Sequence, residues 1–348
     1  MGESMHEKMM RMHQMGGNNE QAKLSSYEVA LKGKVQIAEG TYSFTFEKPK
    51  GFQFKAGQHI RMTLINPTET DSEGNSRFWT IASTPQDKDL LIAMRMRDTA
   101  FKRVLSSMPI GTKVLIQIRQ HVHVGAFALH DDSSIPAVFI AGGIGVVPAY
   151  SMIKDAIERK LNHKLVLFYS NRRPEDAPFL YELQKLAKQH SNFTLVATMT
   201  GVDKSTQKWN GNTGYIDKAV LERYTTNLPS PIYYIAGLPD MVNAMKKLLS
   251  ADGVSNSQIR SEEFGGFTVK QTTKHKYDTK GAFIAALVVI LIIAMISFHV
   301  FAGSILLGAG HSKSHVEKQI VVLTIIAMTV VVIVKVKLIR NHRQSKNK

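Results

Sequence analysis

The chain has 348 residues, 44% of them hydrophobic, and a formal net charge of +16 at pH 7. This length leaves room for about two or three domains. The chain contains no cysteine, which excludes disulfides, thiolate catalysis and a cysteine-ligated iron–sulfur cluster within it.

Residues 1–24 are polar and rich in methionine, histidine and glycine. Five methionines and two histidines lie between Met5 and Met15, and soft thioether ligands are suited to copper. The segment has no apolar periodicity that would bury one face, so we expect a flexible or weakly helical tail. It also lacks the apolar core of a cleavable signal peptide, and none is expected.

Residues 25–132 are expected to form an antiparallel β-barrel. Short runs rich in β-branched and aromatic residues are separated by Gly, Pro, Asn and Asp, which is typical of strands joined by turns. Six such runs favour a small barrel. One helix interrupts them over residues 99–108, with Thr99 as its N-cap. The strand runs are residues 27–38, 41–49, 59–65, 77–83, 89–97 and 113–119.

Residues 133–268 follow a different pattern, in which apolar strands alternate with amphipathic helices. This alternation indicates a parallel sheet covered by helices on both faces. Ligands of such sheets bind at the carboxyl ends of the strands. Strands are predicted over residues 137–141, 164–170, 193–200 and 232–238. Helices are predicted over residues 148–161, 177–189, 217–224 and 239–249.

The C-terminal part of the chain is expected to anchor it in a membrane. Residues 282–310 contain no Asp, Glu, Lys or Arg, and about 20 apolar residues span a bilayer. The second apolar run, residues 319–334, is shorter and needs flanking lysines to snorkel. A buried or interfacial helix is the alternative for that run. The predicted segments are a linker at residues 269–280, a hairpin of two transmembrane helices at 281–340 and a basic tail at 341–348.

Basic residues on both sides of the hairpin predict its orientation. The loop at residues 311–318 carries little net positive charge compared with the two ends. The positive-inside rule then predicts a multi-pass protein of the cell membrane with its preceding domains in the cytoplasm. The lipid bilayer accounts for much of the positive charge, so no nucleic acid is expected as partner. His299 is the one ionisable residue of the first run, and a haem ligand, a quinone contact and a helix contact stay open for it.

Residues 141–150, AGGIGVVPAY, lie between a predicted strand and a predicted helix. Glycines allow backbone N–H groups to approach an anion, and the positive end of a helix adds to the attraction. A dinucleotide pyrophosphate would suit this loop. The order is not GxGxxG, however, and a glycine turn before a helix can also serve tight packing alone.

Residues 77–83, RFWTIAS, alternate an arginine, an aromatic ring and a hydroxyl along a predicted strand. Arg77, Trp79, Ile81 and Ser83 therefore share one face. A cation for phosphate, a flat ring for stacking and a hydroxyl for a ring nitrogen are what a flavin needs. An ordinary sheet face shows the same alternation.

Taken in order, the motifs resemble those of the ferredoxin–NADP reductase superfamily, in which a flavin-binding barrel precedes a nicotinamide-nucleotide α/β domain. RFWTIAS is similar to Arg-x-Tyr-Ser-x-x-Ser, and RMRDTAFKRVL to the following strand and pyrophosphate helix. GGIGVVP is similar to the Gly-Gly-x-Gly-x-x-Pro loop, and AGLPDM to Cys-Gly-x-Pro-x-Met. The resemblance covers residues 26–268. Its pyrophosphate helix implies FAD rather than FMN.

The resemblance implies a set of flavin contacts. Arg77 would pair with a flavin phosphate, Trp79 would stack on the isoalloxazine, and Thr80 would hydrogen-bond near its reactive nitrogen. Arg95 would lie along the flavin, and the N–H groups around Thr99 would hold the pyrophosphate. The residues implied are Arg77, Phe78, Trp79, Thr80, Ser83, Arg95, Thr99, Ala100, Phe101 and Phe267.

The same resemblance implies the nicotinamide-nucleotide site. Ser170, Arg172 and Arg173 would clamp the 2′-phosphate of NADP, since arginine suits bidentate phosphate contact. NADPH is therefore expected, with NADH as the alternative because Glu175 and Asp176 lie close by in the sequence. The residues implied are Gly142, Gly143, Ile144, Gly145, Pro148, Ser170, Arg172, Arg173, Gly237, Pro239 and Met241.

The chain departs from the family pattern beside the nicotinamide. Ala236 stands where the family usually has cysteine. Hydride transfer is therefore expected near Trp79, Thr80 and Ala236, at a rate that the sequence does not fix. No side chain is expected to act as a general acid or base.

Two further segments depart from the pattern or leave a choice open. RQHVHVGAFAL replaces the usual Gly-Pro-x-Gly-x-Phe turn, and its His121 and His123 are interpreted as a barrel edge rather than a metal site. EEFGGF resembles a C-terminal segment that covers the flavin, through either Phe264 or Phe267. No metal is expected in the site.

The function predicted from the sequence is a membrane-anchored, FAD-dependent NAD(P)H oxidoreductase of ferredoxin reductase type. Hydride would pass to the flavin, and electrons would pass on to an acceptor protein, a quinone or a haem that the sequence does not identify. Two alternatives stay open. One is an electron-transfer subunit of a larger membrane redox complex, and the other is a non-catalytic, nucleotide-sensing membrane protein.

Overall fold

The computed structural model describes residues 24–119 and 127–264. The chain divides into two units, Met1–Gly266 and Phe267–Lys348, and every described residue belongs to the first. The predicted linker, hairpin and basic tail, nearly all of the N-terminal tail, and the residues His121, His123, Phe267 and His299 lie outside the described residues.

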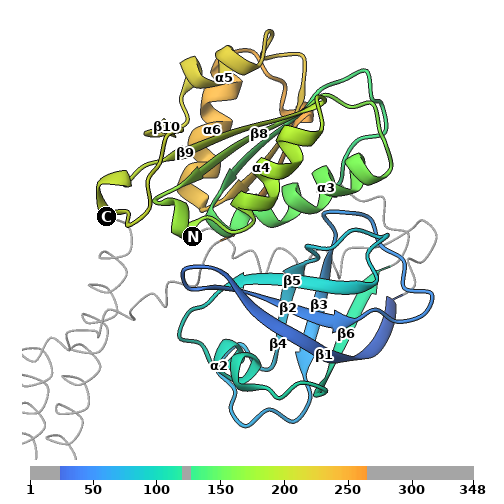
Figure 1. The fold of residues 1–348 in the computed structure, drawn as a ribbon. Coiled ribbons are helices and arrows are strands. Elements are labelled where there is room, and N and C mark those ends of the chain that lie inside the picture. The colour runs from blue at the N-terminus through green and yellow to red at the C-terminus, as the bar shows by residue number, and fades with distance from the viewer. Residues whose placement is uncertain (1–23, 120–126, 265–348) are drawn as a thin grey trace, which may run out of the picture. The chain divides into compact units, whose positions relative to one another are not determined.

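An antiparallel sheet of six strands forms the first half of the described chain (Figure 1). The spatial order is β4-β3-β6-β1-β2-β5. The two edges of the sheet come together where Ile81, the residue after β4, forms a β-bridge with Ile92 of β5. Alternate side chains point inward, and Phe44, Phe46 and Ile60 are fully buried there. The strands are β1 Leu24–Ala38, β2 Thr41–Glu47, β3 His59–Leu64, β4 Ser76–Thr80, β5 Asp89–Arg95 and β6 Lys113–Arg119.

Helix α2, Ala100–Ser107, follows β5 and covers part of this core. The hydroxyl of Thr99 accepts a hydrogen bond from the backbone N–H of Lys102, which makes Thr99 the expected N-cap. Phe101, Val104 and Leu105 are buried, as the i, i+3, i+4 spacing of one helix face requires. Met108 has an extended backbone because the next residue is a proline, and the helix ends there.

A parallel sheet of six strands forms the second half, in the order β10-β9-β8-β7-β11-β12. Its core lies on both faces. Phe139 of β7 packs with residues of α3 and α4, whereas its neighbours Val138 and Ile140 pack with residues of α5 and α6. Helices therefore cover both faces of the sheet, as predicted. The strands are β7 Ala137–Gly142, β8 Leu165–Asn171, β9 Phe193–Met199, β10 Asn212–Thr213, β11 Ile232–Gly237 and β12 Ile259–Glu263.

The helices of this half agree with the predicted ones to within three residues at each end. Short 3₁₀ turns precede two of them. The helices are α3 Val146–Glu158, α4 Leu180–Gln189, α5 Lys218–Tyr224 and α6 Pro239–Ala251, and the turns are η1 Gly143–Gly145, η2 Pro174–Asp176, η3 Val202–Lys204 and η4 Asn256–Gln258. The edge strands β10 and β12 were not predicted, because their polar sequences lack the apolar run of a buried strand.

A buried polar cluster fixes the segment that joins the two sheets. Nε2 of His130 lies 2.9 Å from the carbonyl oxygen of Ile135, and Nδ1 lies 2.9 Å from the hydroxyl of Tyr234. A carbonyl oxygen only accepts, so Nε2 carries the proton and Nδ1 accepts from the tyrosine. Arg260 donates to the same hydroxyl at 3.2 Å and to the carbonyl oxygen of Ala128 at 2.6 Å. The neutral imidazole is the form that fits this cluster.

The cluster predicts a loss of stability in mild acid. Burial lowers the pKa of His130; the hydrogen bond to Ile135 opposes this, and the charges of His163 and Arg260 add to it. A histidine with a lowered pKa in the folded state stabilises the fold above its unfolded pKa of about 6.5, and this contribution is lost as the pH falls below that value. We expect urea unfolding to give His130→Gln a free energy of unfolding close to that of the wild-type protein near pH 5.5. The variant should be least stable relative to the wild-type protein near pH 7.5. These two pH values lie about one unit below and above the unfolded pKa. An equal difference at both pH values would contradict this.

Candidate functional site

The carboxyl ends of β7 and β11 lie next to each other, at the point where the strand order reverses. β7 leads into η1 and α3, and β11 leads into α6. Neither α3 nor α6 has a side-chain cap. The first N–H group of α3, that of Val146, already donates to the carbonyl oxygens of Gly143 and Ile144, whereas a helix start without a cap ordinarily leaves further N–H groups for a ligand. Pro148 lies in the first turn of α3 and Pro239 begins α6, as the sequence predicts.

The glycine loop brings the start of α3 against β11. Gly143 has a φ of +54°, a conformation that side chains disfavour. A Cβ atom on Gly145 would lie 2.4 Å from the carbonyl oxygen of Ala236. A Cβ atom on Gly142 would lie 2.5 Å from Sδ of Met241, a residue of α6. Tight packing therefore accounts for part of this motif, and anion binding at the start of α3 stays a prediction.

Glu262 lies beside Ala236 and was not predicted. The two residues are paired across β11 and β12. Oε2 of Glu262 is out of contact with solvent and has no hydrogen-bond partner among the described residues, and burial raises the pKa of this carboxyl to about 8. The backbone N–H of Phe264 donates to the carbonyl oxygen of Gly237 at 2.8 Å, so the C-terminal segment lies along the end of β11. A protonated carboxyl thus lies at the predicted nicotinamide end.

On the barrel, Arg77 and Trp79 share one face, as predicted, and both contact Phe101 of α2. The guanidinium carbon of Arg77 lies 5.4 Å from the centre of the Phe101 ring, and the ring of Trp79 lies 5.8 Å from it. The guanidinium of Arg77 is held by Asp71 at 2.6 Å and by Glu73 at 2.9 Å. Its contact with a flavin phosphate stays a prediction, because the preceding loop already supplies these two carboxylates.

Lys102 is the functional candidate that the sequence did not reveal. Its Nζ donates to the carbonyl oxygen of Arg95 at 2.6 Å and lies 5.7 Å from the centre of the Trp79 ring. Burial, together with the charges of Arg97 and Arg77, lowers the pKa of Lys102 to about 8. Within residues 24–119 and 127–264 no carboxylate forms a salt bridge with it. Nε1 of Trp79 is also buried, and no described residue accepts a hydrogen bond from it, so this corner is suited to an anionic ligand with acceptor atoms.

Other predicted flavin residues have structural partners. β4 ends at Thr80, so Ser83 is not part of the strand face. The Ser83 hydroxyl accepts from the N–H of Leu91 at 3.0 Å, and its carbonyl oxygen accepts from the hydroxyl of Ser151 on α3 at 2.9 Å. Phe78 contacts His59 edge-on, with ring centres 5.6 Å apart. Thr80, Ala100 and Phe101 are buried.

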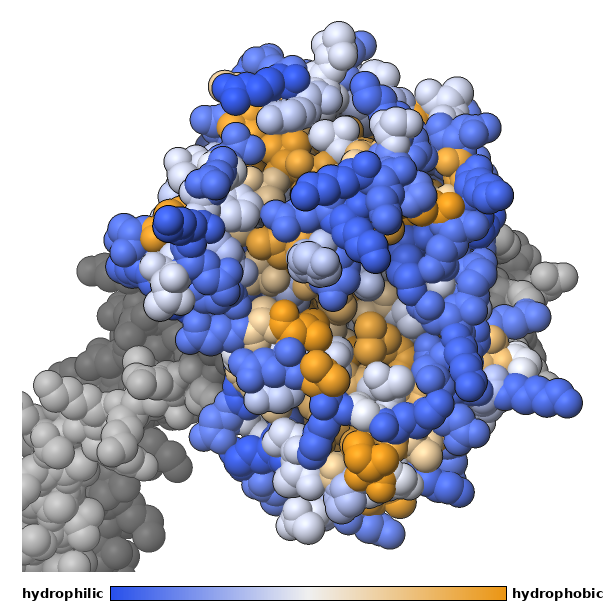
Figure 2. Space-filling model, viewed as in Figure 1, coloured by the Kyte–Doolittle hydropathy of each residue, from blue (hydrophilic) through white to orange (hydrophobic). Residues whose placement is uncertain are grey.

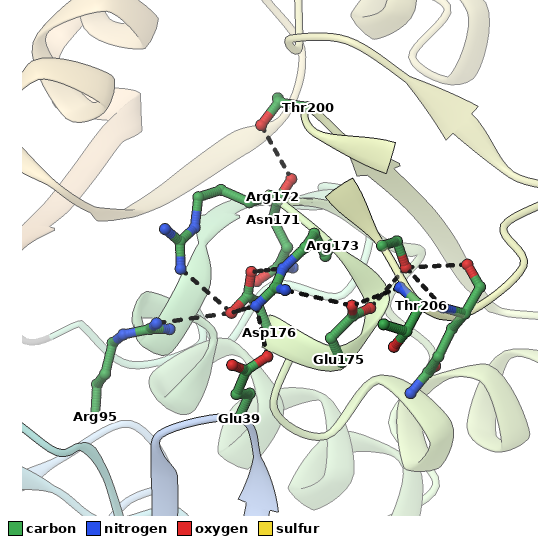
Figure 3. A network of polar contacts seen from close by, with 11 residues as sticks. Glu39, Arg95, Asn171, Arg172, Arg173, Glu175, Asp176, Thr200 and Thr206 are labelled. Carbon is green, nitrogen blue, oxygen red and sulfur yellow. Dashed lines mark hydrogen bonds and ion pairs between the residues drawn. The ribbon is translucent and has the colours of Figure 1, made fainter. Parts of the chain in front are cut away.

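The predicted 2′-phosphate residues lie after β8 in an ion-pair network (Figure 3). Arg172 and Arg173 both contact the carboxylate of Asp176, at 3.2 and 2.9 Å. Arg95, from the barrel, lies 3.6 Å from the same carboxylate. The arginine predicted to lie along the flavin is therefore joined to the arginines predicted to bind the nucleotide. Ser170 is paired with Gly142 of the glycine loop in the sheet register.

Figure 2 shows hydrophilic residues over much of the viewed face, with hydrophobic residues reaching the surface mainly in its middle. Leu238, directly after Gly237, is 57% exposed. An exposed leucine at the end of β11 is available to a ligand or a partner.

Comparison with known proteins finds relatives among the reductase components of electron-transfer systems. Residues 139–247 match the family model of the oxidoreductase NAD-binding domain. The chain is 27% identical over 228 residues to a glycine betaine monooxygenase reductase subunit of Chromohalobacter salexigens, covering 65% of this chain and 60% of that protein. It is 31% identical over 248 residues to one subunit of a Na⁺-translocating NADH-quinone reductase of Serratia proteamaculans, covering 67% and 60%. The chain thus spans 60% of the length of each relative.

A solved structure gives the same result for the fold. The FAD/NAD-binding domain of a nitric oxide dioxygenase from Vibrio cholerae superposes with a TM-score of 0.59 at 16% identity, covering 69% of this chain and 98% of that one. The chain therefore has the ferredoxin-reductase-type FAD/NAD-binding fold. These comparisons agree with the predictions of a ferredoxin-reductase-type enzyme and of FAD with a nicotinamide nucleotide as cofactors.

The prediction of a multi-pass cell-membrane location is overturned. Across the two described ranges, no helix is long and apolar enough to cross a membrane. The relatives include reductase components such as the monooxygenase subunit named above. The prediction of the hairpin depended on hydropathy alone. Residues 281–340, to which it applies, lie outside the described residues. Transmembrane helices form no part of the fold that is shown, and a bilayer partner has no support.

Proposed function

We propose that this chain, which has the ferredoxin-reductase-type fold, takes hydride from NADPH and passes electrons through FAD to an acceptor protein. Its similarity to a monooxygenase reductase subunit supports a protein acceptor. Its similarity to a quinone reductase subunit supports a quinone as the second candidate. In this proposal residues 25–132 bind the flavin, residues 133–268 bind the nucleotide, and NADH is the alternative donor.

The observation that carries the proposal is the half-buried charge of Lys102, which no carboxylate of the described residues neutralises. Burying an ammonium without a counter-charge is costly, and here two neighbouring guanidiniums, of Arg97 and Arg77, raise the cost further. A phosphate group bound at the start of α2 would remove this cost, because the helix end and the lysine would both attract it. The flat face of Trp79 lies under the same lysine and offers a stacking surface.

The protein's contribution to the reaction is binding, orientation and exclusion of water. Bound FAD supplies the hydride acceptor and releases electrons singly or in pairs. The glycine loop and the start of α6 orient the nucleotide at the carboxyl ends of β7 and β11. Ala236 is 1% exposed, so the floor of this site is dry. Glu262 holds a proton on its carboxyl at neutral pH, and its ionisation places a negative charge beside Ala236.

Reconstitution tests the proposal. The purified chain should quench FAD fluorescence with a 1:1 stoichiometry and should then reduce ferricyanide with NADPH. Ferricyanide reduction should be absent without FAD, because no side chain in the site can accept hydride. A folded chain that binds no FAD would refute the proposal.

Glu262→Gln should change the pH dependence of activity and stability together. Burial raises the pKa of Glu262 to about 8, so the folded protein keeps a proton that the unfolded chain releases above about pH 4.5. The free energy of unfolding therefore decreases as the pH rises from that value to the folded pKa. The variant should therefore be more stable than the wild-type protein near neutral pH and above. Its rate of flavin reduction should lose the change that the wild-type enzyme shows near pH 8. An unaltered pH profile in stopped-flow measurements would contradict this role.

A further inference from the structure

A charge network after β8 joins the nucleotide side of the molecule to the barrel (Figure 3). At its centre is Asp176 of η2, which is 3% exposed. Nε of Arg173 lies 2.9 Å from Oδ2 of Asp176, Nη2 of Arg172 lies 3.2 Å from Oδ1, and Nη2 of Arg95 lies 3.6 Å from Oδ1. Hydrogen bonding from Arg173 lowers the pKa of Asp176, with the charges of Arg172 and Arg95 adding to it, although burial opposes the effect.

The charges of this network balance. Nη2 of Arg173 lies 2.5 Å from Glu39 in the β1–β2 turn, and its Nη1 lies 3.5 Å from Glu175. Three carboxylates thus face three guanidiniums. The backbone N–H of Glu39 also donates to the carbonyl oxygen of Glu175 at 2.7 Å, which holds η2 against the barrel turn. A ligand anion arriving here finds no surplus positive charge.

The two neighbouring arginines differ in their freedom to reach a ligand. The side chain of Arg172 is 65% exposed, whereas that of Arg173 is 22% exposed. Among the described residues the guanidinium of Arg172 is paired with Asp176 alone. Arg172 is also two residues after Ser170, which pairs with Gly142 of the glycine loop. Arg172 is therefore the cation that a nucleotide at this edge of the sheet would meet.

We propose that Asp176 is a positioning residue that sets the choice between NADPH and NADH, by holding Arg172 and Arg173 in a balanced network instead of leaving them to a 2′-phosphate. This inference rests on the proposed function. A phosphate monoester carries about −1.5 to −2 charges at neutral pH, so the 2′-phosphate of NADPH competes with the carboxylate of Asp176 for the charge of Arg172. Arg172 has further N–H groups for the phosphate, but it must share its charge between the two anions, and the phosphate then lies close to the carboxylate of Asp176. NADH, with a ribose hydroxyl, brings no second anion. Asp176 therefore restrains the preference for NADPH.

Binding of two adenosine probes to the FAD-loaded chain tests this directly. Calorimetry should compare 2′,5′-ADP with 5′-ADP on the wild-type protein and on Asp176→Asn. We expect the affinity ratio to shift about tenfold toward 2′,5′-ADP, as expected for one charge-assisted hydrogen bond made available. The ratio of kcat/KM for NADPH to that for NADH should shift the same way. Glu222→Gln, which removes an equal charge from a residue of α5 paired with Lys218, should leave both ratios at the wild-type value.

Two outcomes would overturn the role of Asp176 while leaving the proposed function intact. One is an unchanged ratio, and the other is equal weakening of both probes with a lower melting temperature, which a merely structural residue would give. If Asp176→Asn does not fold, Arg172→Gln removes the cation that Asp176 holds and should shift the ratio toward 5′-ADP, and an unshifted ratio there would also overturn the proposal. A wild-type chain that binds neither probe would overturn the nucleotide site itself.

Discussion

Lys102→Met should lower the affinity for FAD roughly ten- to hundredfold at pH 7, as expected when a charge-assisted contact worth about 1.5–3 kcal/mol is lost. The wild-type affinity should fall as the pH rises through about 8, because the free protein releases the Lys102 proton there and a neutral amine attracts phosphate poorly. The variant should lack this pH dependence. Fluorescence titration of FAD between about pH 6.5 and pH 9, on either side of that pKa, measures both effects.

The same substitution should stabilise the protein without its cofactor. A lysine whose folded pKa lies below its unfolded value disfavours folding wherever the unfolded chain is protonated, so removing it is favourable near neutral pH. Lys113→Met is the matched control, because Lys113 is an exposed residue of β6 whose partner is Glu28. Equal losses of FAD affinity in both variants would mean that total charge, and not the Lys102 position, holds the cofactor.

Gly145→Ala should separate flavin binding from flavin reduction. The added Cβ atom would lie 2.4 Å from the carbonyl oxygen of Ala236 and 2.8 Å from the backbone nitrogen of Gly237, so η1 and β11 must move apart. Overpacking of this kind costs about 1–3 kcal/mol. A displacement of about 1 Å at a reacting centre lowers rates about a hundredfold. We therefore expect FAD to remain bound, while its reduction by NADPH in stopped-flow experiments slows by about two orders of magnitude.

Gly33→Ala provides the control for this experiment. A Cβ atom there would meet nothing within 4 Å, and both FAD binding and the reduction rate should stay at wild-type levels. If Gly145→Ala reduced its flavin as fast as the wild-type protein, the glycine loop would not position the nucleotide. If it lost FAD instead, the loop would belong to the flavin site.

Much of the fold is readable in the sequence because each half carries one dominant period. β-branched and aromatic residues in alternation mark β1 to β6, and continuous apolar runs mark β7, β8, β9 and β11. β12 could not be predicted, since its sequence IRSEE has neither pattern. It is a strand because β11 offers a free edge, which is a property of the assembled sheet rather than of the segment.

The candidate site was less accessible to prediction. The motifs locate Trp79 and Gly145, because a ring on an alternating strand and a glycine before a helix are local signals. Lys102 gives no such signal, since a lysine in an amphipathic helix is ordinarily solvated and only packing against Trp79 shows its burial. The burial of Glu262 likewise becomes apparent only once β12 is paired with β11. The partners of Arg77 come from the loop before β4, whose path the sequence does not determine.

The central claim is that one polypeptide brings nucleotide and flavin into reacting contact. Anaerobic titration of the purified, FAD-loaded chain with NADPH tests it most directly, with the visible absorption band of the flavin as the signal. The account predicts that about one equivalent of NADPH bleaches the band fully, because hydride transfer is stoichiometric, and that air or an acceptor restores it. A folded chain that binds both FAD and NADPH while its flavin stays oxidised would contradict the account.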